Sequence, residues 1–98
     1  MNVVEWQGRV SFSDDKMQKV PLFDSERMFC DVYCFQPGQE QRAHRHDASD
    51  KVYVVLRGSG TFRVGSEERV LHAGQAVIAP AGEEHGALRE FLRTEQPA

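Results

Sequence analysis

Long apolar runs and clusters of basic residues are missing from this 98-residue sequence, and we expect no targeting segment. No stretch approaches the roughly 18 consecutive apolar residues of a membrane-spanning helix, so we expect no membrane partner. The 12 basic residues are scattered and are outnumbered by 15 acidic ones. The net charge of -3 argues against binding to the phosphate backbone of nucleic acids. Residues 1–6 include an acid, Glu5, instead of a basic and then apolar pattern, so we expect a cytoplasmic protein.

Cysteine is also scarce, with only Cys30 and Cys34 present. Both lie in residues 28–35, whose β-branched and aromatic content is typical of a strand. Positions four apart on one strand are separated by roughly 13 Å, whereas a disulfide needs α-carbons within about 7 Å. The two thiols therefore cannot bridge each other, and we expect buried free thiols. A redox or ligand role is the alternative, and no zinc spacing supports it.

Short apolar runs alternate with turn residues along the chain, and no helical period persists for ten residues. This pattern predicts an all-β barrel or sandwich of nine or ten short strands. Gly58 and Gly74 are expected in turns that need a positive φ, and Pro80 is expected to end a strand. The expected strands are residues 3–6, 9–12, 18–23, 27–36, 40–46, 51–57, 60–64, 68–72, 76–79 and 85–92.

Two of the four histidines are spaced so that they could ligate one metal ion, and a third begins a later strand. His44 and His46 flank a single residue in a strand-like stretch, so both imidazoles project from one face about 7 Å apart along the backbone. His85 begins the last expected strand. Three neutral imidazoles suit Fe, Mn, Ni, Cu or Zn, and open coordination positions distinguish a catalytic site from a structural one. A His-x-His pair alone is weak evidence for a metal site. The fourth histidine, His72, is expected to be exposed.

The frame around these histidines resembles the cupin superfamily, in particular the small single-domain cupins of the cupin 2 conserved β-barrel family. The first cupin motif is matched over residues 38–58 by Gly38-x5-His44-x-His46, followed by Asp50-Lys51 and Gly58. The second is matched over residues 74–89 by Gly74-x5-Pro80-x-Gly82-x2-His85. The agreement of glycine, proline and histidine positions across two motifs makes the resemblance specific.

This resemblance implies the cupin double-stranded β-helix, a jelly-roll-like conserved barrel of two facing antiparallel sheets with a pocket inside. It also implies a divalent transition metal held by His44, His46 and His85 at the closed end of that pocket. The identity of the metal stays open among Fe, Mn, Ni, Cu and Zn.

The sequence departs from the family pattern at the fourth ligand, a glutamate whose place is held by Lys51. The acid Asp50 lies one residue earlier. Because a strand alternates faces, both cannot point inward unless a bulge intervenes. An inward ammonium would oppose a divalent ion by roughly 6 kcal/mol at about 5 Å and an effective dielectric near 20. Three alternatives remain: Asp50 is a shorter ligand, the site has three histidines with Lys51 turned away or neutral, or the metal is absent.

Two further residues are candidates to line the pocket together with Lys51. Tyr53 lies two positions beyond Lys51 on the same expected strand, which puts both side chains on one face. Arg89 replaces the asparagine that ends the second motif. It could pair with a substrate carboxylate, although a solvated surface arginine is the alternative.

The cupin fold hosts many chemistries, so the resemblance alone does not select a reaction. We expect a small metal-binding cupin that acts on or binds a small molecule in the barrel pocket. One hypothesis is an enzyme, a metal-dependent oxidoreductase of dioxygenase type in which the metal brings substrate and O2 together. The alternative is a non-catalytic small-ligand-binding cupin, metal-free because Lys51 replaces the family glutamate. The sequence assigns no catalytic residue.

We predict one cupin domain over residues 1–98, because this length fits a single compact core. Residues 1–23 are expected to form an N-terminal strand extension, and residues 94–98 a frayed polar tail. A barrel of this size buries a modest fraction of its surface, and the extension would leave open strand edges. We therefore expect a homodimer in which the partner covers these edges.

Overall fold

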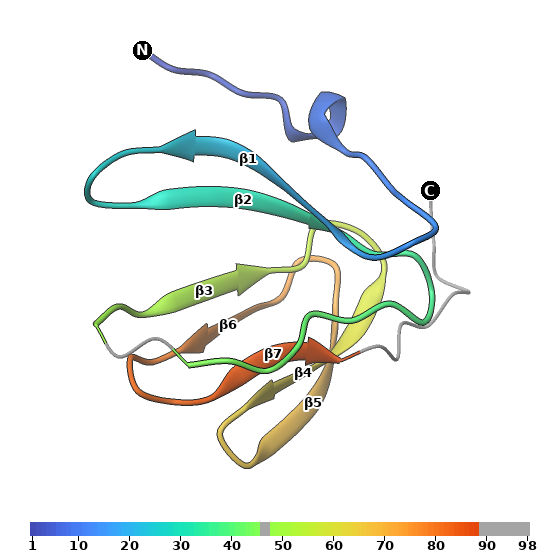
Figure 1. Cartoon of the computed structure of the whole chain (residues 1–98), viewed down its shortest axis with the longest axis vertical. Coiled ribbons are helices and arrows are strands. Elements are labelled where there is room, and N and C mark those ends of the chain that lie inside the picture. Colours follow the sequence, from blue (N-terminus) through green and yellow to red (C-terminus); the bar gives the residue numbers. More distant parts are fainter. Residues whose placement is uncertain (46–47, 89–98) are drawn as a thin grey trace. The chain divides into compact units, whose positions relative to one another are not determined.

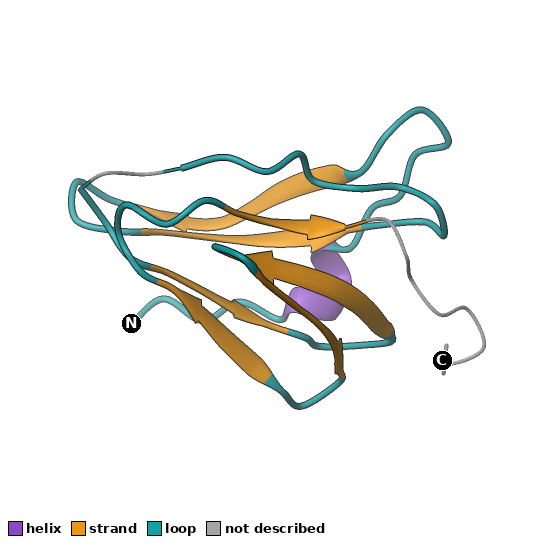
Figure 2. Cartoon of the chain, turned by 90° about the horizontal axis from the view of Figure 1, so that it is seen from below, coloured by secondary structure: helices purple, strands orange, loops and turns teal. Residues whose placement is uncertain are grey.

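The computed structural model describes residues 1–45 and 48–88, which consist almost entirely of strands and turns (Figures 1 and 2). These residues contain one short 3-10 helix and seven strands. The elements are η1 (Trp6–Arg9), β1 (Gln18–Asp24), β2 (Phe29–Cys34), β3 (Lys51–Val54), β4 (Ser59–Val64), β5 (Glu67–His72), β6 (Ala76–Ala79) and β7 (His85–Leu88). The chain divides into two compact units, an N-terminal unit, Met1–Gln36, and a C-terminal unit that begins at Pro37.

The N-terminal unit is built on a hairpin in which β1 pairs with β2 in antiparallel fashion. The hairpin turn is closed by a hydrogen bond of 2.8 Å from the Ser25 backbone N–H to the Met28 carbonyl. The pairing shifts register between Pro21 and Phe23, which marks a bulge in β1. The hairpin therefore matches the strands predicted over residues 18–23 and 27–36.

The strand extension predicted for residues 1–23 is wrong before Gln18, because no strand forms over residues 3–12. The Gly8 N–H instead donates to the Glu5 carbonyl at 3.2 Å, which closes the turn of η1. The Arg9 guanidinium donates to the Pro21 carbonyl at 2.8 Å. This segment is thus joined to β1 by a side chain, whereas a strand needs a backbone ladder with its neighbour.

The two cysteines of β2 are both free, as predicted. Cys34 is buried, and its Sγ accepts a long hydrogen bond of 3.5 Å from the Ser11 N–H. Cys30 is exposed, so the expectation of two buried thiols is wrong for this residue. It lies near the hairpin turn, and burial along β2 increases only from Asp31 onwards.

The C-terminal unit contains two antiparallel sheets (Figure 1). In one sheet β3 pairs with β6, and in the other β4 lies between β5 and β7. The turns between strands follow the sequence prediction, since Gly58 and Gly74 have φ angles of 77° and 93°. L-residues with side chains rarely adopt such angles, which explains glycine at both positions. β6 ends at Ala79, immediately before Pro80, as predicted.

Strand alternation gives the β3–β6 sheet an inner and an outer face. Tyr53 is buried, and its ring centroid lies 5.3 Å from that of Phe62 on β4, so this face looks toward the other sheet. Val52 and its cross-strand partner Ile78 are 58% and 61% exposed and define the outer face. Among the described residues of this unit, the buried apolar ones are Tyr53, Leu71, Ala79 and Ala87.

Some predictions are not tested by the structure. The single domain over residues 1–98 and the cytoplasmic location stay predictions, and the polar tail of residues 94–98 lies outside the described residues. Within residues 1–45 and 48–88, no helix has the length and apolar character needed to cross a membrane.

Candidate functional site

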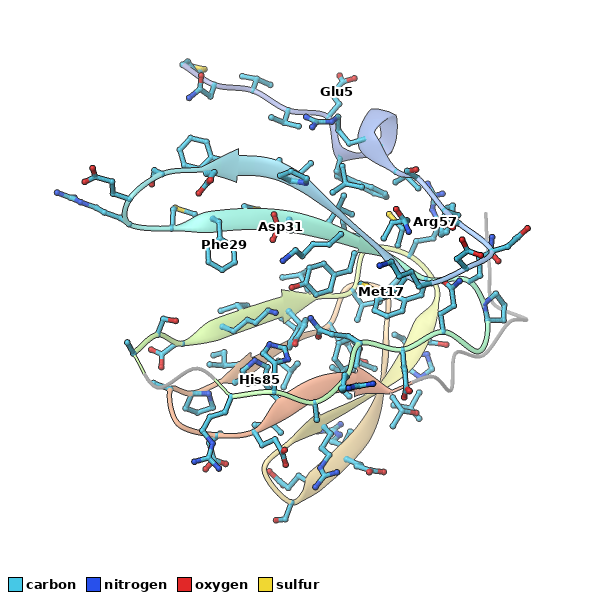
Figure 3. The ribbon with its side chains drawn as sticks, viewed as in Figure 1. Glu5, Met17, Phe29, Asp31, Arg57 and His85 are labelled. Carbon is cyan, nitrogen blue, oxygen red and sulfur yellow. The ribbon has the colours of Figure 1, made fainter. Side chains whose placement is uncertain are left out.

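His85 is the most deeply buried large side chain of the described chain, with 1% of its surface exposed. It begins β7 and lies on the side of that strand that faces β3 (Figure 3). Its Nδ1 is 3.0 Å from the Glu83 carbonyl oxygen. Because a carbonyl can only accept, Nδ1 carries the hydrogen and donates, which places the lone pair of the neutral ring on Nε2.

His44 is brought beside His85 by backbone pairing. The His44 N–H donates to the His85 carbonyl and the His85 N–H donates to the His44 carbonyl, each at 2.8 Å. Opposed residues of an antiparallel bridge project to the same side, and the two ring centroids are 4.4 Å apart. His44 Nδ1 lies 3.1 Å from the Arg42 carbonyl oxygen, so this ring also has its lone pair on Nε2. In the described residues, the strand predicted over 40–46 is reduced to this bridge.

Gly86 permits the close approach of residues 41–44 to β7. A Cβ added at Gly86 would lie 3.0 Å from both the Ala43 Cα and the Gln41 carbonyl oxygen. These are backbone atoms, so the segment itself would have to move to make room. The alignment of His44 with His85 therefore depends on the absence of a side chain at Gly86.

We expect Gly86→Ala to weaken metal binding about tenfold, as loss of a supporting contact does. It should also destabilise the fold by roughly 1–3 kcal/mol, as overpacking does. Metal titration and thermal unfolding measure the two effects. Gly8→Ala is the matched control, because a Cβ at Gly8 has no atom within 4 Å. If Gly86→Ala bound metal as tightly as the parent, the positions of His44 and His85 would not depend on the close approach of residues 41–44 to β7.

Tyr53, a predicted pocket residue, lies beside His85. Its ring centroid is 6.0 Å from that of His85, and its hydroxyl donates to Gln41 Oε1 at 2.6 Å. This hydrogen bond joins β3 to the segment that carries His44. Gln41 was missed by the sequence analysis because it occupies one of the five unspecified positions between Gly38 and His44.

Lys51 shares the inner face of β3 with Tyr53. It is paired with Ala79, which is 0% exposed, and the β3–β6 pairing has no shift of register that could turn it outward. The Lys51 ammonium nitrogen lies 4.8 Å from the centroid of the Tyr53 ring. Its side chain is half-buried. We refer to Gln41, His44, Lys51, Tyr53 and His85 as the inner cluster.

Asp50 has a different environment. It is exposed, and its Oδ1 accepts a hydrogen bond of 2.8 Å from the Ala81 N–H in the turn that precedes His85. Among residues 1–45 and 48–88, no group of three or more His, Cys, Asp or Glu side chains is placed to hold a metal ion. Asp50 thus does not join His44 and His85 in such a group.

The remaining candidates are separate from the inner cluster or lie outside the described residues. His72 is exposed on β5, as predicted, and its N–H donates to Gln75 Oε1. His46 and Arg89 lie outside the described residues, so the third predicted metal ligand and the arginine predicted for the pocket are not tested.

Two side chains of the inner cluster, His44 and His85, carry nitrogen atoms of the kind that divalent transition metals bind. Their Nδ1 atoms are held by backbone carbonyls, as the second nitrogen of a metal-bound histidine usually is. The ammonium of Lys51, in the same cluster, disfavours metal binding because it repels a divalent cation.

Comparisons with known proteins identify the family of this chain. The cupin domain model matches residues 31–90. The crystal structure of TT1209 from Thermus thermophilus is 44% identical, with a TM-score of 0.88, and the match covers 92% of this chain and 86% of that one. The pectin degradation protein KdgF of Dickeya dadantii is 29% identical over 75 residues, and the oxalate-binding protein of Thermotoga maritima is 25% identical over 69 residues.

These two matches cover 76% and 70% of this chain, and 67% and 56% of the respective relatives. The chain thus spans little more than half the length of the oxalate-binding protein. A protein with a double-stranded β-helix domain from Klebsiella pneumoniae, 23% identical, has a TM-score of 0.84, and the match covers 93% of this chain and 84% of that one. The predicted all-β double-stranded β-helix is confirmed, and the chain belongs to the cupin family.

Proposed function

We propose that this protein is a metal-binding cupin that binds a small molecule at the inner cluster. The observation that carries the proposal is the pairing of His44 and His85, whose Nδ1 atoms are both held by backbone carbonyls. The first cupin motif supplies His46 as the third ligand. The names of two relatives, one a pectin degradation protein and the other an oxalate-binding protein, support a small or sugar-derived ligand.

The metal would be a divalent transition ion, with its identity open among Fe, Mn, Ni, Cu and Zn. Such an ion supplies Lewis acidity and open coordination positions for ligand oxygen atoms. If the protein is an enzyme, it would be a metal-dependent oxidoreductase of dioxygenase type. We assign Asp50 to the turn at Ala81 and not to the metal, because its carboxylate already accepts the Ala81 N–H.

A non-catalytic, metal-free ligand-binding protein is the second candidate. The position of Lys51 over Tyr53 favours it, because an ammonium on the inner face repels a cation and attracts an anion. The two candidate functions differ in metal content, so a measurement of bound metal distinguishes them.

Elemental analysis of protein purified without a histidine tag tests the metal proposal. We expect about one equivalent of a divalent transition metal per chain, either as purified or after addition of metal and removal of the excess. Protein that stays folded and retains well under about a tenth of an equivalent under both conditions would support the metal-free candidate instead.

We also propose a homodimer, formed through the outer face of the β3–β6 sheet and not through edges of residues 3–12, which form no strand. Val52, Val54 and Ile78 are 56–61% exposed there, and adjoining exposed apolar side chains are typical of association surfaces. Light scattering at micromolar concentration should give twice the chain mass of 11.1 kDa. Ile78→Asp should give the monomer mass, whereas Val70→Asp, at an exposed position of β5, should not. A monomeric parent protein would contradict the proposal.

A further inference from the structure

A tight turn leads the chain from the end of β6 into His85. The Glu83 N–H donates to the Pro80 carbonyl at 3.1 Å, and Gly82 has a φ of 87°. This combination is typical of a type II turn, whose third residue needs a positive φ and whose second residue is commonly proline. Ala81 is the second residue here. The turn sets the path by which the chain enters β7.

Asp50 attaches this turn to β3. Lys51 pairs with Ala79, so the residue before β3 lies beside the residues that follow β6. The Asp50 Oδ1 accepts the Ala81 N–H at 2.8 Å. A carboxylate that accepts a backbone N–H forms a charge-assisted hydrogen bond, which is stronger than one between neutral groups. The two residues are 31 positions apart, so this bond fixes the turn to a separate part of the sheet.

The same turn carries the atom that orients the His85 ring. The His85 Nδ1 donates to the Glu83 carbonyl at 3.0 Å, which places the lone pair of the neutral ring on Nε2. The hydrogen bond of one ring nitrogen determines which tautomer a histidine adopts, and therefore which nitrogen can ligate a metal. If the Glu83 carbonyl moved away, the hydrogen could transfer to Nε2, which would then not ligate. The tautomer of His85 thus depends on the position of the turn.

We infer that Asp50 is a positioning residue for His85. By holding the Ala81 N–H, it keeps the Glu83 carbonyl where that oxygen accepts the Nδ1 hydrogen. The inference rests on the proposed function, in which His85 is a metal ligand. It gives the acid of the first motif a role that needs no contact with the metal, because Asp50 acts on the ligand through the turn.

The hydrogen bond between Asp50 and Ala81 can be removed from either end. Asp50→Ala removes the acceptor, whereas Ala81→Pro removes the N–H donor and leaves the carboxylate in place. Proline suits the second position of a type II turn, so the turn itself should form in Ala81→Pro. Asp50→Asn keeps an acceptor oxygen. Glu68→Ala, at an exposed position of β5, is the matched control.

Two properties are measured for each variant, after circular dichroism has verified that it is folded. Heteronuclear NMR of the imidazole nitrogens in metal-free protein reports which nitrogen of His85 carries the hydrogen. Titration with Zn2+ in competition with a chelator reports the metal affinity. The first measurement needs no metal, so it tests the role of Asp50 separately from the metal proposal.

We expect His85 of the parent to carry its hydrogen on Nδ1, and both Asp50→Ala and Ala81→Pro to give a mixture of the two tautomers. Each of these variants should bind Zn2+ about tenfold more weakly, the lower end of the range for loss of a supporting contact. The double variant should lose no more than either single variant, because both changes remove the same hydrogen bond. Asp50→Asn and Glu68→Ala should match the parent in both measurements.

An unchanged His85 tautomer in Asp50→Ala and Ala81→Pro would overturn the inference. It would also be overturned if Asp50→Ala lost Zn2+ affinity and Ala81→Pro did not, because the carboxylate itself would then be the ligand. If the parent bound no Zn2+, the metal proposal would fail, and the tautomers of the metal-free variants would still decide whether Asp50 positions His85.

Discussion

His44→Ala is expected to lower the affinity for a divalent transition metal by at least about 100-fold. Loss of a residue that merely supports a metal ligand costs about 10–100-fold, so loss of a ligand itself should cost more. His44 is suited to this test because it is half-buried, whereas His85 is almost completely buried and its removal would leave a cavity. Competition titration with a fluorescent chelator measures the affinity.

His72→Ala is the matched control for this prediction. His72 lies on the exposed face of β5, and the hydrogen bond to Gln75 involves only its backbone N–H. Its removal should therefore leave metal affinity unchanged. If His72→Ala lost as much affinity as His44→Ala, or if His44→Ala lost none, the metal would have to bind elsewhere. His46→Ala should behave like His44→Ala, a prediction that rests on the sequence motif.

Lys51→Glu is expected to raise metal affinity by at least about tenfold. The substitution replaces repulsion by attraction on the inner face of β3, beside Tyr53. One unit charge acting on a divalent ion at about 5 Å contributes roughly 6 kcal/mol at an effective dielectric near 20. About one fifth of that energy corresponds to a tenfold change, so the prediction allows for strong screening by solvent.

Asp50→Asn tests whether Asp50, the acid next to the glutamate position of the first motif, is a metal ligand. Asparagine keeps an oxygen that can accept the Ala81 N–H, so the turn before His85 should be preserved. We expect unchanged metal affinity, because Asp50 is not grouped with the histidines. Weaker binding in Asp50→Asn together with unchanged binding in Lys51→Glu would show that the carboxylate at position 50 is the ligand and that Lys51 does not face the metal.

Local patterns were sufficient to predict most of the strands. Ala76–Ala79 was predicted with its exact bounds, because Gly74 supplies a positive φ before it and Pro80 ends it. The prediction failed over residues 3–12, where short apolar runs alternate as they do in strands. A strand is stable only with a neighbour to pair with, and the pattern of one segment does not reveal whether such a neighbour exists.

The reaction could not be predicted either from the sequence or from the family. Cupins of one fold carry out unrelated chemistries, because activity depends on a few side chains and not on the barrel. Gln41 illustrates the difficulty. It orients Tyr53 through a hydrogen bond of 2.6 Å, although the motif leaves its position unspecified.

The sequence alone predicts an all-β protein, and its two motifs resemble those of the cupins, which implies the barrel and the candidate residues without coordinates. Whether Lys51 or Asp50 faces inward does not follow from it. Strand alternation shows only that neighbouring residues point to opposite faces. The packing of the two sheets establishes which face is the inner one, because the buried partner Ala79 and the contact of Tyr53 with His85 exist only after the sheets have come together.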